Sequence, residues 1–194
     1  MSLTFFPVLT QTQSGSLEDF ISFWSKLYVY DNPKLYEKIH NKTLSEIDLK
    51  DLYKWKNGMN LSQAKEKSLN TKIIKKIDII NNLRAMVEID LEYFLKEFKQ
   101  VSIVWKFFLL HIVNPNKYPI YDQHVHRAYR FMNSELSEDI RASMNEAVKL
   151  KFYLEEYYPF VRESKIKDLK KMDEAFFAFG QFINIGNQKI LVTS

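Results

Sequence analysis

Glycine is scarce in this chain, and the four glycines are Gly15, Gly58, Gly180 and Gly186. The stretch from 59 to 179 therefore has none of the glycines that hairpins and sheets use where the backbone needs a positive φ. Apolar residues in the same stretch recur at the three- and four-residue spacing of amphipathic helices. The sequence therefore predicts an all-α fold.

Capping residues and apolar periodicity divide the chain into expected helices. Asn57-Gly58 is expected to end one helix in a left-handed cap, Asp90 to begin another, and Pro159 to stop a long one. One short strand is expected at 189–192. The expected helices cover residues 16–28, a short segment from 33, 44–56, an amphipathic stretch 65–86, 91–98, 101–113, 123–132, 137–158 and 165–183.

Size and composition favour one helical domain, 1–194. With 194 residues, 46% hydrophobic and 15% aromatic, the chain can bury a substantial core. Two lobes are possible within it, one of about 1–88 with the C-terminal helix and one of about 89–160. The net charge of +4 permits a nucleic-acid partner without requiring one.

The absence of cysteine excludes disulfides, thiolate nucleophiles and cysteine zinc sites. The most apolar stretch, 103–113, contains Lys106 and His111 and is about half of the ~20 residues that a membrane span needs. The first residues lack the basic and apolar regions of a signal peptide. We therefore expect a soluble cytoplasmic protein with no membrane partner.

The segment 114–127 carries the strongest functional signal. Pro115 and Pro119 interrupt an apolar helix and leave Asp122 at the start of the next one. An aspartate in this position suits a helix N-cap, because its carboxylate accepts hydrogen bonds from free backbone amides. The same position suits a catalytic carboxylate at the mouth of a cleft, so both interpretations stay open.

Other common chemistries lack their patterns. His124 and His126 are two residues apart, so a helix would point them to different faces, and no H-x-x-x-H pair accompanies them. No G-x-S-x-G elbow, P-loop or dinucleotide fingerprint occurs. We expect neither a metal nor an organic cofactor.

The segment Tyr121-Asp122-Gln123-His124-Val125-His126-Arg127 resembles the D-x-H-V-x-R motif of the helix-hairpin-helix DNA glycosylases, the superfamily of endonuclease III and 8-oxoguanine DNA glycosylase. The preceding Pro119-Ile120 is similar to the family's lead-in to its catalytic aspartate. The likeness covers about 99–131, with a weaker one at 172–177. It implies a two-lobed helical glycosylase-like fold with a cleft between the lobes, and DNA as the partner.

The resemblance also implies roles for single residues. Asp122 would stabilise the cationic sugar or orient the attacking water, with the base flipped into a pocket. His124 would contact a DNA phosphate, and Arg127 matches a family arginine that serves either DNA or a structural ion pair. The implied nucleic-acid-binding residues are Gln100, Ser102, His124, Arg127 and Lys106, and the implied base-pocket residues are Trp105, Tyr118 and Tyr121.

The chain departs from the family at three positions. The hairpin signature G-V-G falls on Gln100, Val101 and Ser102, so both glycines that let backbone amides approach a phosphate are replaced. The lysine that forms a Schiff base in bifunctional members falls on Val104, with Lys106 nearby. The replaced lysine speaks against lyase activity, and both departures favour a glycosylase-like scaffold that has lost catalysis.

The sequence thus predicts a DNA base-excision glycosylase that hydrolyses an N-glycosidic bond with Asp122 as the catalytic carboxylate. Two alternatives stay open. One is a catalytically inactive glycosylase-fold scaffold that binds DNA or protein. The other is a helical interaction protein with no nucleic-acid role.

Overall fold

The computed structural model describes residues 15–30, 32–133 and 145–186. Within these ranges every regular element is a helix, and no strand occurs. The prediction of an all-α fold is confirmed for this part of the chain. The strand expected at 189–192 lies outside the described residues.

The described α-helices are α1 (Leu17–Trp24), α2 (Pro33–Tyr36), α3 (Glu46–Asn57), α4 (Gln63–Lys72), α5 (Ile77–Ala85), α6 (Leu91–Glu97), α7 (Ile103–Val113), α8 (Gln123–Met132), α9 (Glu146–Phe152), α10 (Tyr158–Ser164) and α11 (Leu169–Gly186). The other described helical elements are three 3₁₀ turns, η1 (Ser25–Leu27), η2 (Glu37–His40) and η3 (Ile74–Lys76), and one π-helix, η4 (Tyr153–Tyr157).

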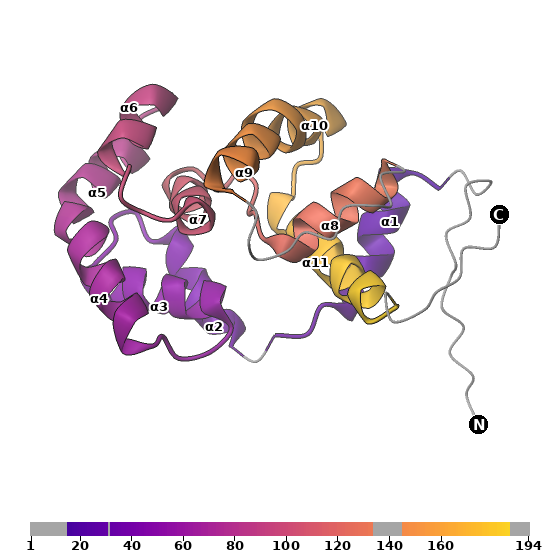
Figure 1. The fold of residues 1–194 in the computed structure, drawn as a ribbon, viewed down its shortest axis with the longest axis horizontal. Helices are drawn as coiled ribbons and strands as arrows, with labels where there is room; N and C mark the ends of the chain where they lie inside the picture. The colour runs from indigo at the N-terminus through magenta and orange to yellow at the C-terminus, as the bar shows by residue number, and fades with distance from the viewer. Residues whose placement is uncertain (1–14, 31, 134–144, 187–194) are drawn as a thin grey trace.

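The helices pack around a hydrophobic core that runs through the described part of the chain. Figure 1 shows α2 to α6 gathered on one side, α1, α8 and α11 on the other, and α7 with α9 between them. The longest helix, α11, packs against α8 and α1, while α7 contacts both α5 and α9. This arrangement brings α3, α7, α8 and α11 together around one cavity.

Local capping explains several of the helix boundaries. Gly58 ends α3 with φ of 73°, the left-handed cap that the sequence predicts. Asp90 caps α6 by accepting hydrogen bonds from two backbone amides, also as predicted. Asp122 does the same for α8, which spans the predicted residues 123–132.

The amphipathic stretch predicted as one helix over 65–86 is instead broken after Lys72. Ile73 leaves helical geometry with φ of −122° and ψ of −59°, and the turn η3 follows it. The side chains of Ile73 and Ile74 are buried in the core. The break therefore lets Ile73 and Ile74 pack in the core, and this packing outweighs the helical preference of the surrounding residues.

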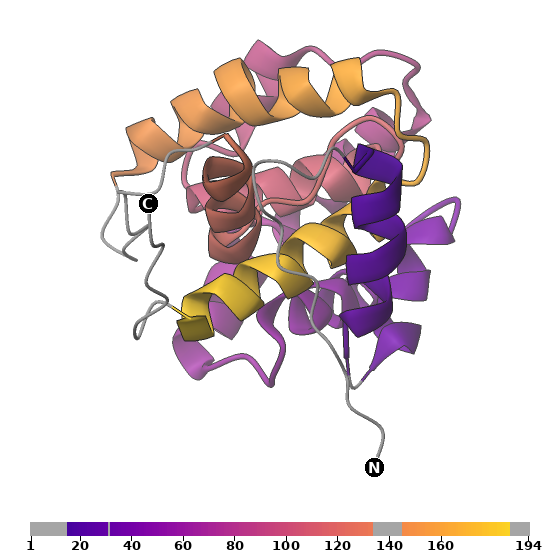
Figure 2. The ribbon, with the colours of Figure 1, turned by 90° about the vertical axis from the view of Figure 1, so that its right-hand side faces the viewer.

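The prediction that Pro159 stops a helix is wrong. Figure 2 shows α9, η4 and α10 running end to end as one rod. Pro159 lies in the first turn of α10, directly after the π-helix η4, where a missing N–H and a fixed φ are tolerated. The rod ends instead at Lys165, whose φ of 58° is left-handed. Part of the predicted helix, 137–144, lies outside the described residues.

Candidate active site

A cavity of about 440 Å³ lies where α3, α7, α8 and α11 meet. Its wall combines six aromatic residues with four charged ones. Ligand pockets commonly combine these two features, because apolar walls bury the ligand and a few polar groups orient it. The lining residues are Tyr28, Tyr30, Trp55, Lys56, Asn57, Gly58, Val104, Trp105, Tyr121, Asp122, Gln123, His124, Lys149, Asp173 and Phe177.

Asp122 lies at the cavity wall and also caps α8. Its Oδ1 accepts hydrogen bonds from the backbone N–H groups of His124 (2.8 Å) and Val125 (3.0 Å). Its Oδ2 accepts a hydrogen bond from Nζ of Lys56 at 3.1 Å. Both side chains are largely buried, with 8% of Lys56 and 16% of Asp122 exposed. The N-cap interpretation is therefore confirmed, and the same carboxylate faces the cavity.

The surroundings of Asp122 favour its ionised form. Burial acts to raise the pKa of this carboxyl, but the charge of Lys56, the amide of Val125 and the side chain of His124 together lower it below its ordinary value. The N-terminus of α8 adds a favourable helix dipole. A negative charge is thus fixed at one wall of the cavity.

A second carboxyl, Asp173 on α11, lines the same cavity and is 3% exposed. Its Oδ1 has no hydrogen-bond partner among the described residues. Burial raises the pKa of Asp173 to about 7, although Lys56 and Lys170 act to lower it. The charge of Asp122 also raises this pKa. The cavity therefore holds two carboxyls whose pKa values are shifted in opposite directions.

Four residues assigned from sequence meet at the cavity: Trp105 and Tyr121, both implied base-pocket residues, together with Asp122 and His124. Tyr118, the third implied base-pocket residue, lies elsewhere. Its ring is 1% exposed and stacks on the ring of Tyr158 at a centroid distance of 5.3 Å. Its burial beneath Tyr158 explains why it does not reach the cavity wall.

The other implied nucleic-acid-binding residues also lie away from the cavity lining. Gln100 and Ser102 are exposed before α7, and Lys106 is 8% exposed, with its pKa lowered by burial. Arg127 contacts Nδ1 of His124 at 3.2 Å and donates a hydrogen bond to the carbonyl of Gly180 at 3.0 Å. It thereby joins α8 to α11.

Three charged residues at the cavity, Lys56, Lys149 and Asp173, were not among the residues assigned from sequence. Lys56 follows the usual pattern of a basic residue in the last turn of a helix, which complements the dipole and gives no other signal. Asp173 did carry a signal, because it falls on the apolar face of α11 between buried Met172 and Phe176. A carboxyl on such a face is buried only for a specific reason.

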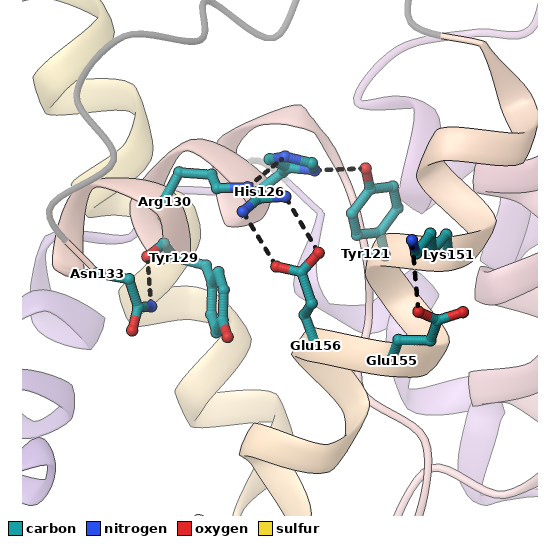
Figure 3. Close-up of polar contacts among 8 residues, drawn as sticks. All are labelled: Tyr121, His126, Tyr129, Arg130, Asn133, Lys151, Glu155 and Glu156. Carbon is teal, nitrogen blue, oxygen red and sulfur yellow. Dashed lines mark hydrogen bonds and ion pairs between the residues drawn. The ribbon is translucent and has the colours of Figure 1, made fainter.

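A hydrogen-bond network holds the side chain of Tyr121, the residue before Asp122; Figure 3 shows its members Tyr121, His126, Arg130 and Glu156. The hydroxyl of Tyr121 lies 2.8 Å from Nδ1 of His126, whose Nε2 accepts a hydrogen bond from Nε of Arg130 at 3.4 Å. Arg130 in turn forms a two-pronged ion pair with Glu156 of η4, at 3.0 and 3.2 Å. Burial lowers the pKa of His126 to about 3, so the ring is neutral. Its Nδ1 therefore donates to the Tyr121 oxygen.

Within the described ranges, no three histidine, aspartate or glutamate side chains gather in a group that could hold a metal ion. None of the described helices has the length and apolar character required to cross a bilayer. No protein-family model, curated protein or solved structure matches this chain. The cavity and its charged groups are therefore the basis for a functional assignment.

Proposed function

We propose that this chain is a DNA glycosylase-type enzyme that hydrolyses an N-glycosidic bond, with Asp122 as the catalytic carboxylate and without a cofactor. The observation that carries this proposal is the placement of the ionised Asp122 and its partner Lys56 in the wall of an aromatic cavity. The proposal includes the two-lobed arrangement, with the cavity as the cleft between lobes.

The size and walls of the cavity support a nucleobase as its occupant. A volume of about 440 Å³ falls within the range of roughly 300–1,000 Å³ that is usual for small-ligand pockets. Trp105 and Tyr30, both partly exposed, provide rings on which a base can stack. A base buried in this cavity would have to leave its duplex stack, as in enzymes that flip their target nucleotide.

The geometry of Asp122 supports its catalytic role. Breaking an N-glycosidic bond leaves positive charge on the sugar, and a carboxylate nearby stabilises that charge mainly in the transition state. Two amide hydrogen bonds and Lys56 fix the position of Asp122 before a substrate arrives. Such a fixed group needs little reorganisation during the reaction.

The test is base release from a panel of duplex and single-stranded DNAs carrying damaged or mismatched bases, measured under single-turnover conditions. Asp122→Asn should keep the fold and lower base release about 100-fold or more. Asp90→Asn is the matched control, because Asp90 also caps a helix through two amides but lies outside the cavity. Borohydride should trap no adduct, because water rather than Lys56 attacks the sugar. Wild-type protein that releases no base from any substrate would contradict the proposal.

One observation favours a second candidate, a helical interaction protein with no nucleic-acid role. The backbone N–H of Ile103, at the start of α7, donates to Oε1 of Glu146 at 3.1 Å. A carboxylate thus takes the position at this helix start where an anionic phosphate would otherwise bind. No affinity for any duplex or single-stranded DNA at low salt would select this candidate, whereas salt-sensitive DNA binding would reject it.

A further inference from the structure

The carboxyl of Asp173 has no evident structural role among the described residues. Its Oδ1 is buried without a hydrogen-bond partner, in a side chain that is 3% exposed. Burying a polar atom without a partner costs free energy, on the order of 1–3 kcal/mol. An apolar residue at this position of α11 would avoid that cost. The side chain instead lines the cavity that also contains Asp122.

We propose that Asp173 is the general acid of the reaction, which protonates the departing base while Asp122 stabilises the sugar. This inference rests on the proposed function. The proton moves from the Asp173 carboxyl to a ring nitrogen or carbonyl oxygen of the base, and the C1′–N bond breaks with its electron pair staying on the base. Water then adds to C1′ and gives a proton to Asp122, Asp122 releases this proton to solvent, and solvent restores the proton of Asp173.

The charged groups around Asp173 allow it to hold a proton near neutral pH. Lys56 of α3 and Lys170 of α11 favour the ionised carboxylate, whereas burial, Asp122 and Glu174 favour the protonated form. The neighbouring side chains of Tyr28, Tyr36 and Tyr157 are uncharged, because burial raises the pKa of each.

The two carboxyls therefore differ in how easily they ionise, as a general acid and a charge-stabilising carboxylate must. Asp122 is held ionised by Lys56 and by two amides, whereas Asp173 has no amide donor to its free oxygen. Two carboxyl groups in one site take different roles when their surroundings push their pKa values apart. The cavity therefore has one group able to give a proton and another that stays negative.

The leaving base provides the decisive test. A neutral base needs a proton in order to leave, whereas 7-methylguanine is already cationic and does not. Asp173→Asn should lower single-turnover release of a neutral base by about 100-fold, within the usual range for general acids, and release of 7-methylguanine by less than about 10-fold. Asp122→Asn should lower both. Glu163→Gln, which removes an exposed carboxylate of α10, is the control.

The pH dependence gives a second readout. Release of a neutral base by wild-type protein should fall above about pH 7, and the Asp173→Asn variant should lose this dependence. The ¹³C chemical shift of the Asp173 carboxyl, assigned by its loss in the variant, should titrate near neutral pH.

Three results would overturn the assignment. They are equal losses for both bases in Asp173→Asn, an Asp173 carboxyl that is fully ionised at pH 6, and a wild-type protein that releases only the cationic base. A wild-type protein that releases no base would reject the proposed function itself, and the general acid with it.

Discussion

Gly180 of α11 lies directly against the main-chain carbonyl of His124 in α8. A Cβ on residue 180 would lie 2.0 Å from that carbonyl oxygen, far closer than any ordinary contact. Arg127 reinforces the same crossing by donating to the Gly180 carbonyl at 3.0 Å. The two backbones thus meet where α8, which starts beside Asp122, crosses α11, which carries Asp173. This crossing fixes the distance between the two carboxyls.

Gly180→Ala should therefore both destabilise the protein and disturb the cavity. The methyl group meets backbone atoms rather than the end of a flexible side chain, so the helices must separate. We expect a loss of about 2 kcal/mol or more in the free energy of unfolding, measured by urea denaturation. Gly15→Ala is the control, because a Cβ there meets nothing within 4 Å. Equal stabilities of the two variants would contradict the tight crossing.

Substitutions of Asp122 should separate its capping role from its charge. Asparagine keeps the cap and alanine removes it, so Asp122→Ala should be less stable than Asp122→Asn by about 1 kcal/mol. Asp90, which caps α6 through the same two-amide geometry and is exposed, should show the same difference between its alanine and asparagine variants. Urea denaturation of the four variants measures both differences.

A comparison of Asp122→Asn with Asp90→Asn then measures how much the ion pair with Lys56 contributes to stability. Asp122→Asn should cost roughly 2 kcal/mol more than Asp90→Asn, because Lys56, 8% exposed, loses its partner. This figure is below the ~3–5 kcal/mol of a fully buried pair. Equal costs would show that the Lys56 contact adds no stability.

The helices that the sequence predicted well are those set by local chemistry. The bounds of α8 follow from Asp122 at one end and the loss of apolar spacing at the other, and the end of α3 follows from Gly58. The break at Ile73 was not predictable, because it depends on core contacts made by distant helices. The prediction that Pro159 stops the helix failed for a related reason, because no local sequence pattern indicates the π-helix before it.

The candidate site was predictable only where its residues are neighbours in sequence. The motif identified Asp122 and His124, but Lys56 comes from a helix 66 residues earlier. Which face of α3 meets α8 depends on the packing of the whole domain, and a single sequence does not contain it. Asp173 was recognisable as unusual on an apolar face, but only the fold shows that it lines the same cavity as Asp122.

Asp173→Asn should stabilise the protein more at high pH than at low pH. The ordinary pKa of 3.8 applies to the unfolded chain, and burial raises the folded value to about 7. Between these values only the unfolded chain gives up the proton, so the wild-type protein loses stability as the pH rises, and the variant does not. The stability of the variant relative to wild type should grow by roughly 2–3 kcal/mol from pH 5 to pH 8. An unchanged difference in urea denaturation would contradict the raised pKa.

Two buried histidines should make the protein sensitive to acid. Burial lowers the pKa of both His111 and His126 from 6.5 to about 3. Below pH 6.5 the unfolded chain takes up protons that the folded chain does not, so stability is complete above this pH and falls as the pH drops toward 3. Each histidine should cost about 2 kcal/mol at pH 5. Urea denaturation measures this loss. It is carried out on the Asp173→Asn variant, because the Asp173 carboxyl changes the stability with pH in the opposite direction.

Variants of single histidines show which residue causes this pH dependence of the free energy of unfolding. His126→Gln should lower the proton uptake on unfolding between pH 6 and pH 5 by about one, whatever its effect on absolute stability, because one titrating ring is removed. If the His126 variant keeps the wild-type slope, the neutral ring that donates to Tyr121 is excluded, and with it the network that holds Tyr121 beside Asp122.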